Sequence, residues 1–413
     1  MKQIYIDISE MVRLPYISGI QRVVIEILKE WLQTIPDSIS IMTFDYPRKE
    51  YRILDARWFL SAAGNPKQMK KRWLHYTDRK KIEDFSKGDI FFDLDSAWIS
   101  PLKRSWLLPK LKAQGAKIAV NIYDIIPVTH PKYCHEHNVL SFLEYLGAHL
   151  SYADLMIANA QATIDAMKAL TEETGSLIPE TAVVPLGCDF SGGVGAGSSG
   201  KPKRSEEDDA AGVDYRKAHR IEDDTVSRIR GNIRRIPENG KYILMVGTIE
   251  PRKNHAYVLD AFDRTLFAQG VNLVFAGRIG WNMTDFTERI QSHPQQGKQF
   301  YHIPDGNDDE IAFLYESAYA VAFSSLDEGF GLPIIEAFLH GTPVLASDIP
   351  VLREVGGNRC VYFDVSDENS LSEQTLQLLS DQEYYQRLKE QVEDYQPYTW
   401  EESATKMREV LNI

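Results

Sequence analysis

The chain contains 413 residues, and a typical length of about 100–200 residues per domain predicts two or three domains. Apolar residues make up 43% and charged residues 25%, a globular composition that excludes global disorder, collagen and a small disulfide scaffold. The 46 basic and 59 acidic residues give a net charge of −13, which argues against a general nucleic-acid binder. We therefore expect a partner that is a small ligand or that meets a local basic patch.

Cysteine usage and hydropathy indicate a compartment. Cys134, Cys188 and Cys360 are far apart and form no C-x-x-C pair, which argues against a disulfide framework and a zinc site and favours a reducing cytosol. Asp7 and Glu10 interrupt any apolar run near the start, so no signal peptide is predicted. No stretch approaches the roughly 18–20 apolar residues of a membrane span. We expect a cytoplasmic protein that can still lie peripherally on the inner face of a membrane.

Strand and helix patterns alternate in two blocks. Residues 1–190 begin with a short apolar strand and a helix capped by Ser18, and the same alternation recurs up to ETAVVPLG. Residues 191–238 are rich in glycine and serine and then in charge, which predicts a linker. The alternation resumes over 239–395, and an amphipathic helix follows in 396–413. The predicted fold class is α/β, with two Rossmann-like domains whose ligands bind at the carboxyl ends of parallel strands.

Two glutamates in the second block form the strongest chemical signal. Glu328 follows a predicted strand in a loop with Gly329 and Gly331, and Glu336 lies eight residues later on the next helix. Carboxylates placed in this way can converge on sugar or ribose hydroxyl groups. The glycines let the backbone approach such a ligand closely. The start of the helix offers free N–H groups to an anion. The alternative interpretation is a solvated glutamate after a glycine turn.

Two cations follow an earlier strand of the same block. Gly247 ends the strand KYILMVG, and Arg252 and Lys253 stand where the next helix begins. Cations beside a helix N-terminus form a site suited to a pyrophosphate. The alternative interpretation is a pair of exposed turn cations.

Together, VGTIEPRKN and EGFGLPIIEAFLHGTPVLASD resemble family 4 of the retaining GT-B-fold glycosyltransferases, with the E-x7-E pattern intact as Glu328 and Glu336. The resemblance implies two domains facing across a cleft, with the helix around Trp400 crossing back onto the first. It implies that Arg252 and Lys253 bind the donor diphosphate, that Glu336 binds the ribose and that Glu328 lies near the donor sugar. Backbone contacts with the donor are implied for the intervening turn, at Gly329, Phe330, Gly331, Leu332 and Pro333.

The first block resembles the same family more loosely. The segment ISGIQRV resembles the Gly-rich first loop, which implies that Gly19 lies close to the donor phosphates. Many relatives have His-Asp where this chain has Tyr123 and Asp124, and a tyrosine cannot act as a near-neutral base. Asp124 is expected to keep a catalytic carboxylate at the cleft, although it can also serve only as a cap after a strand. The catalytic set implied by the resemblance is Asp124, Arg252, Lys253 and Glu328.

Three other motifs have competing interpretations. Asp93 and Asp95 mimic the metal-binding D-x-D motif of a different glycosyltransferase fold. In a GT-B protein cationic side chains replace the metal, so we expect no metal and no other cofactor. Asp95 and Trp98 could instead line the acceptor side of the cleft. The segment Cys134–Asn138 is interpreted as a polar surface turn. Residues 66–81 form a basic run with interleaved aromatic residues, which indicates either docking on anionic lipid or a solvated loop.

The combined hypothesis is a retaining glycosyltransferase in polysaccharide or glycan assembly. It would move a hexose, with GDP-mannose favoured as donor, from a nucleotide-sugar to a hydroxyl group of a glycan, lipid-linked or protein-linked acceptor. One alternative is a GT-B-fold sugar-nucleotide epimerase or phosphorylase. Another is a catalytically inactive GT-B subunit that stabilises a partner, which the replacement at Tyr123 leaves open.

Overall fold

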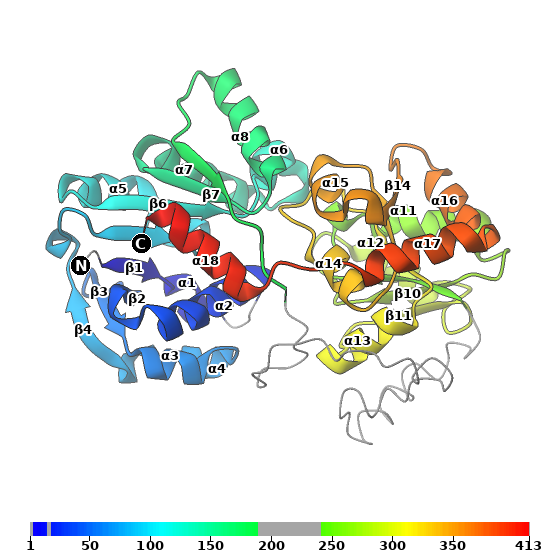
Figure 1. Ribbon diagram of the computed structural model, residues 1–413, viewed down its shortest axis with the longest axis horizontal. Coiled ribbons are helices and arrows are strands. Elements are labelled where there is room, and N and C mark those ends of the chain that lie inside the picture. Colours follow the sequence, from blue (N-terminus) through cyan, green and yellow to red (C-terminus); the bar gives the residue numbers. More distant parts are fainter. Residues whose placement is uncertain (1–2, 15–17, 189–240, 413) are drawn as a thin grey trace. The chain divides into compact units, whose positions relative to one another are not determined.

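The computed structural model describes residues 3–14, 18–188 and 241–412 (Figure 1). The linker expected at 191–238 lies outside these described residues. The described residues divide into two compact units. The first contains those up to 188, together with Glu328–Phe330 and 398–412, and the second contains 241–327 and 331–397.

The first unit is built around an eight-stranded sheet with the order β4-β3-β2-β1-β5-β6-β7-β8. Its main elements are β1 (Ile4–Asp7), α1 (Ser9–Arg13), α2 (Gly19–Thr34), β2 (Ile39–Asp45), β3 (Glu50–Leu54), α3 (Ala56–Ala62), α4 (Pro66–Met69), η2 (Arg72–Leu74), β4 (Tyr76–Lys80), β5 (Ile90–Asp93), α5 (Arg104–Ala113), β6 (Lys117–Ile122), α6 (Ile126–Thr129), α7 (Glu136–Tyr152), β7 (Leu155–Ala158), α8 (Gln161–Thr174), β8 (Glu180–Val183) and α18 (Trp400–Leu411).

Six neighbouring strands of this sheet, from β2 to β8, are parallel, as the alternating pattern predicts. Two strands at one edge, which the sequence pattern does not predict, are antiparallel: β3 pairs with β2, and β4 pairs with β3. The connection from β2 to β3 is a short turn with Lys49 at a φ of 53°, so no crossover helix separates these strands. Tight turns of this kind join antiparallel strands, whereas parallel strands need a long connection.

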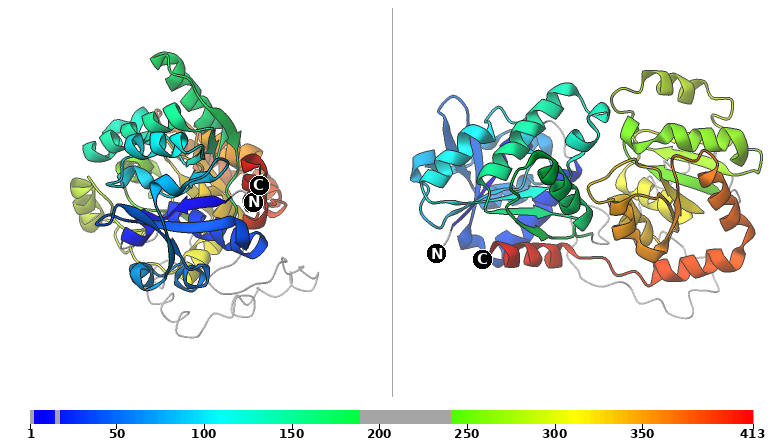
Figure 2. Two further views of the ribbon diagram at one scale, coloured as in Figure 1. Left: turned by 90° about the vertical axis from the view of Figure 1, so that its left-hand side faces the viewer. Right: turned by 90° about the horizontal axis from the view of Figure 1, so that it is seen from above.

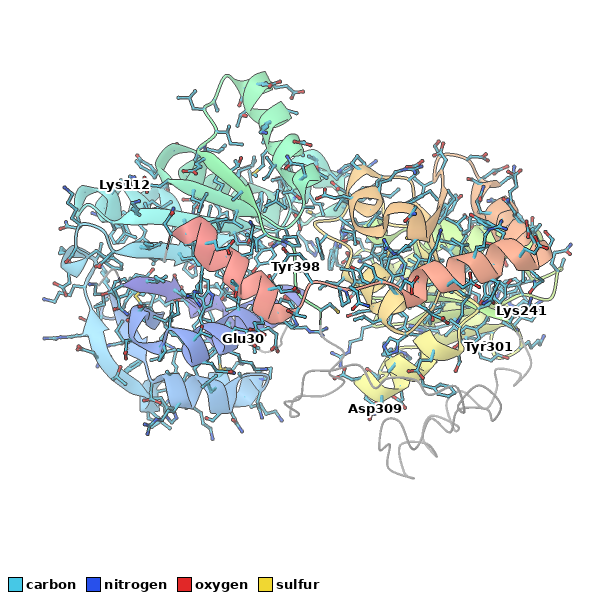
Figure 3. All side chains as sticks on the ribbon, in the orientation of Figure 1. Glu30, Lys112, Lys241, Tyr301, Asp309 and Tyr398 are labelled. Atoms are coloured by element: carbon cyan, nitrogen blue, oxygen red, sulfur yellow. The ribbon has the colours of Figure 1, made fainter. Side chains whose placement is uncertain are left out.

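The last helix of the chain belongs to the first unit. Helix α18 packs beside α2, and the indole N–H of Trp31 on α2 donates to the carbonyl of Ala404 at 2.9 Å (Figures 1 and 2). Tyr398 lies just before α18 (Figure 3). Its carbonyl accepts from the backbone N–H of Cys188 at 2.8 Å. A Cβ at Gly187 would lie 2.6 Å from the backbone of Trp400, so only glycine allows this close approach of two chain segments.

The second unit has a six-stranded, fully parallel sheet with the order β11-β10-β9-β12-β13-β14. Its main elements are β9 (Tyr242–Val246), η7 (Pro251–Lys253), α11 (His255–Ala261), η8 (Phe262–Leu266), β10 (Asn272–Ala276), α12 (Thr284–Ser292), β11 (Phe300–Ile303), α13 (Asp308–Ser317), β12 (Ala320–Phe323), α14 (Leu332–Leu339), β13 (Val344–Ser347), α15 (Pro350–Gly356), β14 (Cys360–Phe363), α16 (Ser370–Ser380) and α17 (Gln382–Glu393).

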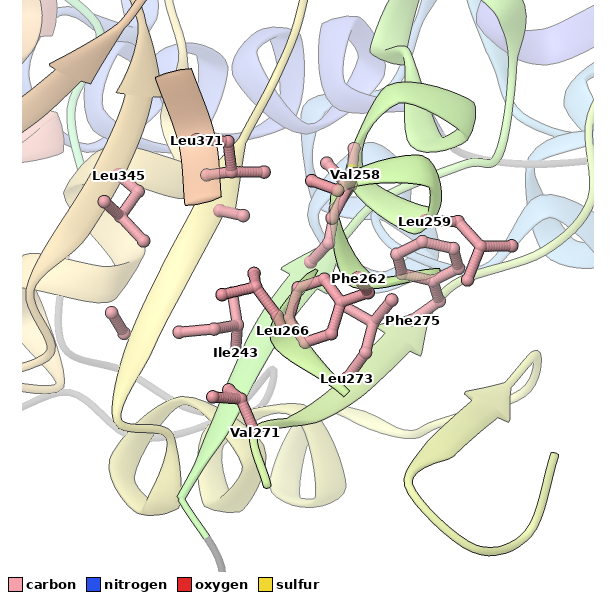
Figure 4. Close-up of a cluster of buried hydrophobic side chains, with 14 of the residues drawn as sticks. Ile243, Val258, Leu259, Phe262, Leu266, Val271, Leu273, Phe275, Leu345 and Leu371 are labelled. Atoms are coloured by element: carbon pink, nitrogen blue, oxygen red, sulfur yellow. The ribbon is translucent and has the colours of Figure 1, made fainter. Parts of the chain in front are cut away.

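The core of the second unit fixes α11 against the sheet. Ile243 on β9 and Phe275 on β10 belong to the same buried cluster as Val258 and Leu259 on α11 (Figure 4). Strands with both faces covered read as continuous apolar runs, which is why the sequence pattern locates them. Because α11 is held in this way, the turn that leads into it from β9 is held as well.

Local residues set where several helices begin and end. Ser18 and Asn307 precede α2 and α13 in capping boxes, and Gly175 ends α8 with a φ of 66°. The expected polar turn at Cys134–Asn138 is wrong in its second half, because α7 begins at Glu136. The cysteines at 134, 188 and 360 are not joined by disulfide bonds. Among the described residues, no helix combines the length and apolar character needed to span a bilayer.

Candidate functional site

Two loops at the carboxyl ends of β9 and β10 run side by side. The backbone N–H of Ile249 donates to the carbonyl of Arg278, and that of Gly280 donates to the carbonyl of Ile249, both at 2.8 Å. Gly277 has a φ of 152°, and a Cβ there would lie 2.0 Å from the carbonyl oxygen of Gly247. The glycines that end these strands therefore allow the close pairing that holds the β9–α11 turn in place.

Arg252 is fixed by two polar partners at this turn. One terminal nitrogen of its guanidinium, Nη2, donates to Oε1 of Glu250 at 2.8 Å, and the other, Nη1, donates to the carbonyl of Asp327 at 2.7 Å. Glu250 is buried, and Leu326 donates its backbone N–H to the carbonyl of Arg252 at 2.9 Å. These bonds join the turn after β9 to the loop after β12, the strand beside β9 in the sheet.

Lys253 places its charge at the carboxyl end of β12. Its Nζ lies 4.7 Å from the centroid of the Phe323 ring, the last residue of that strand. The backbone carbonyl of Lys253 accepts from the hydroxyl of Ser324 at 2.8 Å. A Cβ added to Gly247 would lie 3.9 Å from Cε of Lys253, so the lysine side chain passes close to this glycine. Two cationic side chains are thus held at the ends of two adjacent parallel strands.

The loop after β12 leads into the N-terminus of α14. Glu328, Gly329 and Phe330 lie in this loop, and Gly331 precedes the helix with a φ of 103°. The positive φ favours glycine here, and a Cβ at this position would lie 2.9 Å from Cδ2 of Leu352, so that side chain would have to shift. The first turn, at Leu332, presents backbone N–H groups that have no partner within the helix. This helix end can bind an anion.

Glu336 lies on α14, one turn beyond its first residues. Its Oε2 accepts from the hydroxyl of Tyr315 on α13 at 3.1 Å, and Tyr315 itself is buried. The Tyr315 carbonyl accepts from the hydroxyl of Thr342, which anchors the end of α13 to the segment after α14. The carboxylate of Glu336 is therefore oriented by a neighbour on a different helix.

The candidate residues of the first unit lie after its parallel strands. Gly19 is the first residue of α2 and has no atom within 4 Å of a Cβ built on it. Asp124 follows β6 and accepts from the backbone N–H of Ile126 at 3.0 Å, so it does cap the start of α6. The Tyr123 hydroxyl is buried and donates to the carbonyl of Leu94 at 2.8 Å. Burial raises the pKa of Tyr123 well above its ordinary value, which keeps this hydroxyl from acting as a base.

The D-x-D motif points into the interior of the first unit. Asp93 pairs with Arg104, and Asp95 accepts from the Gln21 amide at 2.8 Å and the Met11 backbone N–H at 2.7 Å. Burial raises the pKa of Asp95 to about 6. Both carboxylates thus have protein partners. Within the described ranges, no group of three or more His, Cys, Asp or Glu side chains is arranged to hold a metal ion.

His255 is a buried residue that the sequence motifs do not single out. It starts α11 directly after Asn254, is 1% exposed, and packs edge-on against Phe275 with ring centroids 4.9 Å apart. Neither ring nitrogen has a hydrogen-bond partner among the described residues. Burial, with the nearby charge of Lys253 and with His302, lowers the pKa of His255 to about 3. The ring is therefore neutral in the folded protein at ordinary pH.

We expect His255 to make the second unit less stable in acid. Below about pH 6.5 this histidine is protonated in the unfolded chain but stays neutral in the folded chain. This difference lowers the free energy of unfolding by about 1.4 kcal/mol for each pH unit below 6.5. Denaturant unfolding of the wild type and His255→Leu, measured from pH 7.5 to 4.5, isolates this contribution as the difference between them. A difference that does not change with pH would contradict the expectation.

The same turn also forms one wall of a cavity. Glu250, Pro251, Asn254 and His255 line a space of about 500 Å³, and the opposite lining comes from residues 282–286 at the start of α12. The cavity thus adjoins the turn that carries Arg252 and Lys253.

The second unit therefore contains half of the expected site residues. Arg252, Lys253, Gly331, Leu332 and Glu336 gather along the carboxyl edge of one sheet, with Glu328–Phe330 in the adjoining loop. Gly19, Asp124 and Glu328–Phe330 belong to the first unit. Sequence reasoning missed Glu250 and Tyr315, which orient Arg252 and Glu336. The Glu at position 250 is visible within EPRKN, but nothing local pairs Tyr315 with a residue 21 positions away.

Comparisons with known proteins give the similarity of the chain as a whole. Residues 229–395 match the family model for glycosyl transferases group 1. The serotype-specific mannosyltransferase WbdA of Escherichia coli is 27% identical over 98% of this chain, which covers 44% of WbdA. The O-antigen chain mannosyltransferase RfbU of Salmonella typhimurium is 36% identical over 32% of this chain and 37% of its own length. The chain thus spans less than half the length of these relatives.

A solved structure extends the likeness to the whole fold. Anabaena HepE, crystallised in complex with UDP and glucose, superposes with a TM-score of 0.64 and 14% identity, covering 100% of both chains. The chain therefore has a GT-B type of fold, and its residues 229–395 are similar to glycosyl transferases group 1. Its similarity to mannosyltransferases extends over almost its whole length.

Proposed function

We propose that the protein transfers mannose from GDP-mannose to a hydroxyl group of a growing cell-surface polysaccharide, with retention of configuration at the anomeric carbon. The observation that carries this proposal is the gathering of Arg252, Lys253 and the α14 N-terminus at the carboxyl edge of the second sheet. Similarity to WbdA and RfbU supports mannose as the sugar and O-antigen as the class of product.

Arg252 and Lys253 have the chemistry that a departing diphosphate needs. Negative charge builds on the phosphate oxygens as the bond to the sugar breaks, and prepositioned cations stabilise it without reorganisation. Arg252 is held by Glu250 and Asp327, and Lys253 is held over Phe323. The α14 N-terminus adds backbone donors. In this proposal these groups supply the charge that a metal ion provides elsewhere, so the reaction uses no metal or other cofactor.

The remaining residues have roles that follow from the resemblance. Glu336 binds the ribose hydroxyls through the carboxylate that Tyr315 orients, and Glu328 lies near the mannose. The backbone from Gly329 to Leu332 contacts sugar and phosphate, and Gly19 approaches the phosphates from the first unit. Asp124 supplies a carboxylate near the acceptor. Retention follows if the acceptor oxygen attacks the face that the diphosphate leaves, with a phosphate oxygen accepting the acceptor's proton.

A panel of nucleotide-sugars tests the proposal. Thermal shift measures binding, since a ligand that binds the folded state raises its stability. Release of free nucleotide diphosphate with a mannoside acceptor then measures turnover, and NMR of the product gives the anomeric configuration. We expect GDP-mannose to give the largest shift and the fastest release. Binding of no nucleotide-sugar would contradict the proposal, and binding without turnover would favour an inactive subunit.

A further inference from the structure

A cluster of lysines and exposed apolar side chains lies on α4 and η2 of the first unit and contains none of the residues assigned above. It consists of Lys67, Lys70, Lys71, Trp73 and Leu74, which we call the basic–aromatic surface. Trp73 is 65% exposed, more than any other described Trp side chain, and the neighbouring Leu74 is 55% exposed. The three lysines are also exposed.

This surface stands on short, well-anchored elements. Asn65 caps α4 by accepting from the backbone N–H groups of Lys67 and Gln68, and Met69 is buried beneath the helix. After η2, the ring of His75 stacks on Trp58 of α3 with centroids 4.8 Å apart, and its carbonyl accepts from Asp55. Helices α3 and α4 are in contact (Figure 1). Trp73 is therefore held in an exposed position by anchors on both sides.

The charge of this segment opposes that of the whole chain. Residues 66–81 contain seven Lys or Arg and one Asp, whereas the chain carries a net charge of −13. Two of these cations have internal partners, since Arg72 donates to the Tyr76 hydroxyl at 2.6 Å and Lys80 to the Tyr5 hydroxyl at 3.0 Å. Among the described residues, no carboxylate forms an ion pair with Lys67, Lys70 or Lys71.

We propose that the basic–aromatic surface docks the protein on an anionic lipid bilayer. Lysines gain favourable energy near anionic headgroups, and tryptophan is suited to the membrane–water interface. Two exposed apolar side chains make a patch far smaller than the roughly 1,000 Å² that a stable protein–protein interface buries. A lipid surface needs no such area, because it accepts the apolar side chains and the charges together. This inference concerns where the protein works and is independent of its donor.

Vesicle co-sedimentation tests the docking. The full chain is mixed with phosphatidylcholine vesicles, with or without phosphatidylglycerol, at low and high salt. We expect binding only to the anionic vesicles, and weaker binding at high salt because salt screens exposed charges. Lys67→Gln with Lys70→Gln and Lys71→Gln should reduce partitioning at least about tenfold. Trp73→Ser with Leu74→Ser should also reduce it, at unchanged charge.

A second exposed tryptophan provides the matched control. Trp106 on α5 is 46% exposed, and Nζ of Lys110 lies 4.8 Å from its ring. Trp106→Ser with Lys110→Gln should leave vesicle binding unchanged. The triple lysine variant should keep wild-type nucleotide release without vesicles, which separates this inference from the proposed function. Three results would overturn the docking. The wild type fails to bind anionic vesicles, the control variant loses as much binding as the lysine variant, or the protein self-associates through this surface.

Discussion

Replacing Arg252 and Lys253 together with alanine should lower kcat/KM for the nucleotide-sugar about 1,000-fold while the second unit stays folded. Loss of a single preorganised donor to a developing negative charge typically costs about 10²–10³ in rate. Both side chains lie at the carboxyl edge of the sheet, and neither fills the core cluster beneath α11. Nucleotide release measures the effect, and circular dichroism with thermal unfolding checks the fold.

Two further variants make this result specific. Lys298→Ala removes an exposed cation that lies just before β11, at the opposite end of the strands, and should leave nucleotide release unchanged. Arg252→Lys keeps the charge but cannot donate to both Glu250 and the Asp327 carbonyl in the same geometry, so its activity should fall between wild type and the double variant. An equal loss in Lys298→Ala would show that overall charge, and not this site, governs activity.

The second unit could be predicted well because its signals are local. Each buried parallel strand is a short apolar run followed by a glycine or a polar turn, and Gly247, Gly277 and Gly331 stand where a close approach or a positive φ requires them. Arg252 and Lys253 are recognisable because they directly follow such a strand. The antiparallel edge of the first unit was missed because its pairing depends on a four-residue turn between β2 and β3, not on a periodic pattern.

The supporting residues of the site could not be predicted for a related reason. Tyr315 meets Glu336 only because α13 and α14 pack against each other, and no spacing rule connects residues on different helices. The partners of Asp93 and Asp95 likewise come from distant segments, so the D-x-D motif looked like a ligand pair in the sequence while each carboxylate is occupied in the fold. Motifs locate candidate groups, but burial and tertiary partners decide their roles.

Arg104→Met should destabilise the first unit by about 3–5 kcal/mol, because it leaves buried carboxylates without their cation. Asp7 and Asp93 end the adjacent strands β1 and β5, and Arg104 is 1% exposed between them. Its Nη2 lies 2.9 Å from Oδ2 of Asp7, and its Nε lies 2.5 Å from Oδ2 of Asp93. Burial alone would raise the pKa of Asp93, but Arg104 and then His149 outweigh it and lower this pKa to about 2.

Substitutions of all three groups distinguish charge from packing in this network. Arg104→Met combined with Asp7→Asn and Asp93→Asn removes the charges together, and it should recover most of the lost stability because no uncompensated ion stays buried. Arg289→Ala serves as the control, since Arg289 pairs with Asp260 and Asp263 at 2.7 Å near the surface of the second unit, and pairs of that kind contribute about 1 kcal/mol or less. Denaturant unfolding gives the free energies, and hydrogen exchange in β5 and α5 assigns the loss to the first unit. If the triple variant is no more stable than Arg104→Met, packing by the arginine side chain and not its charge holds these strand ends together.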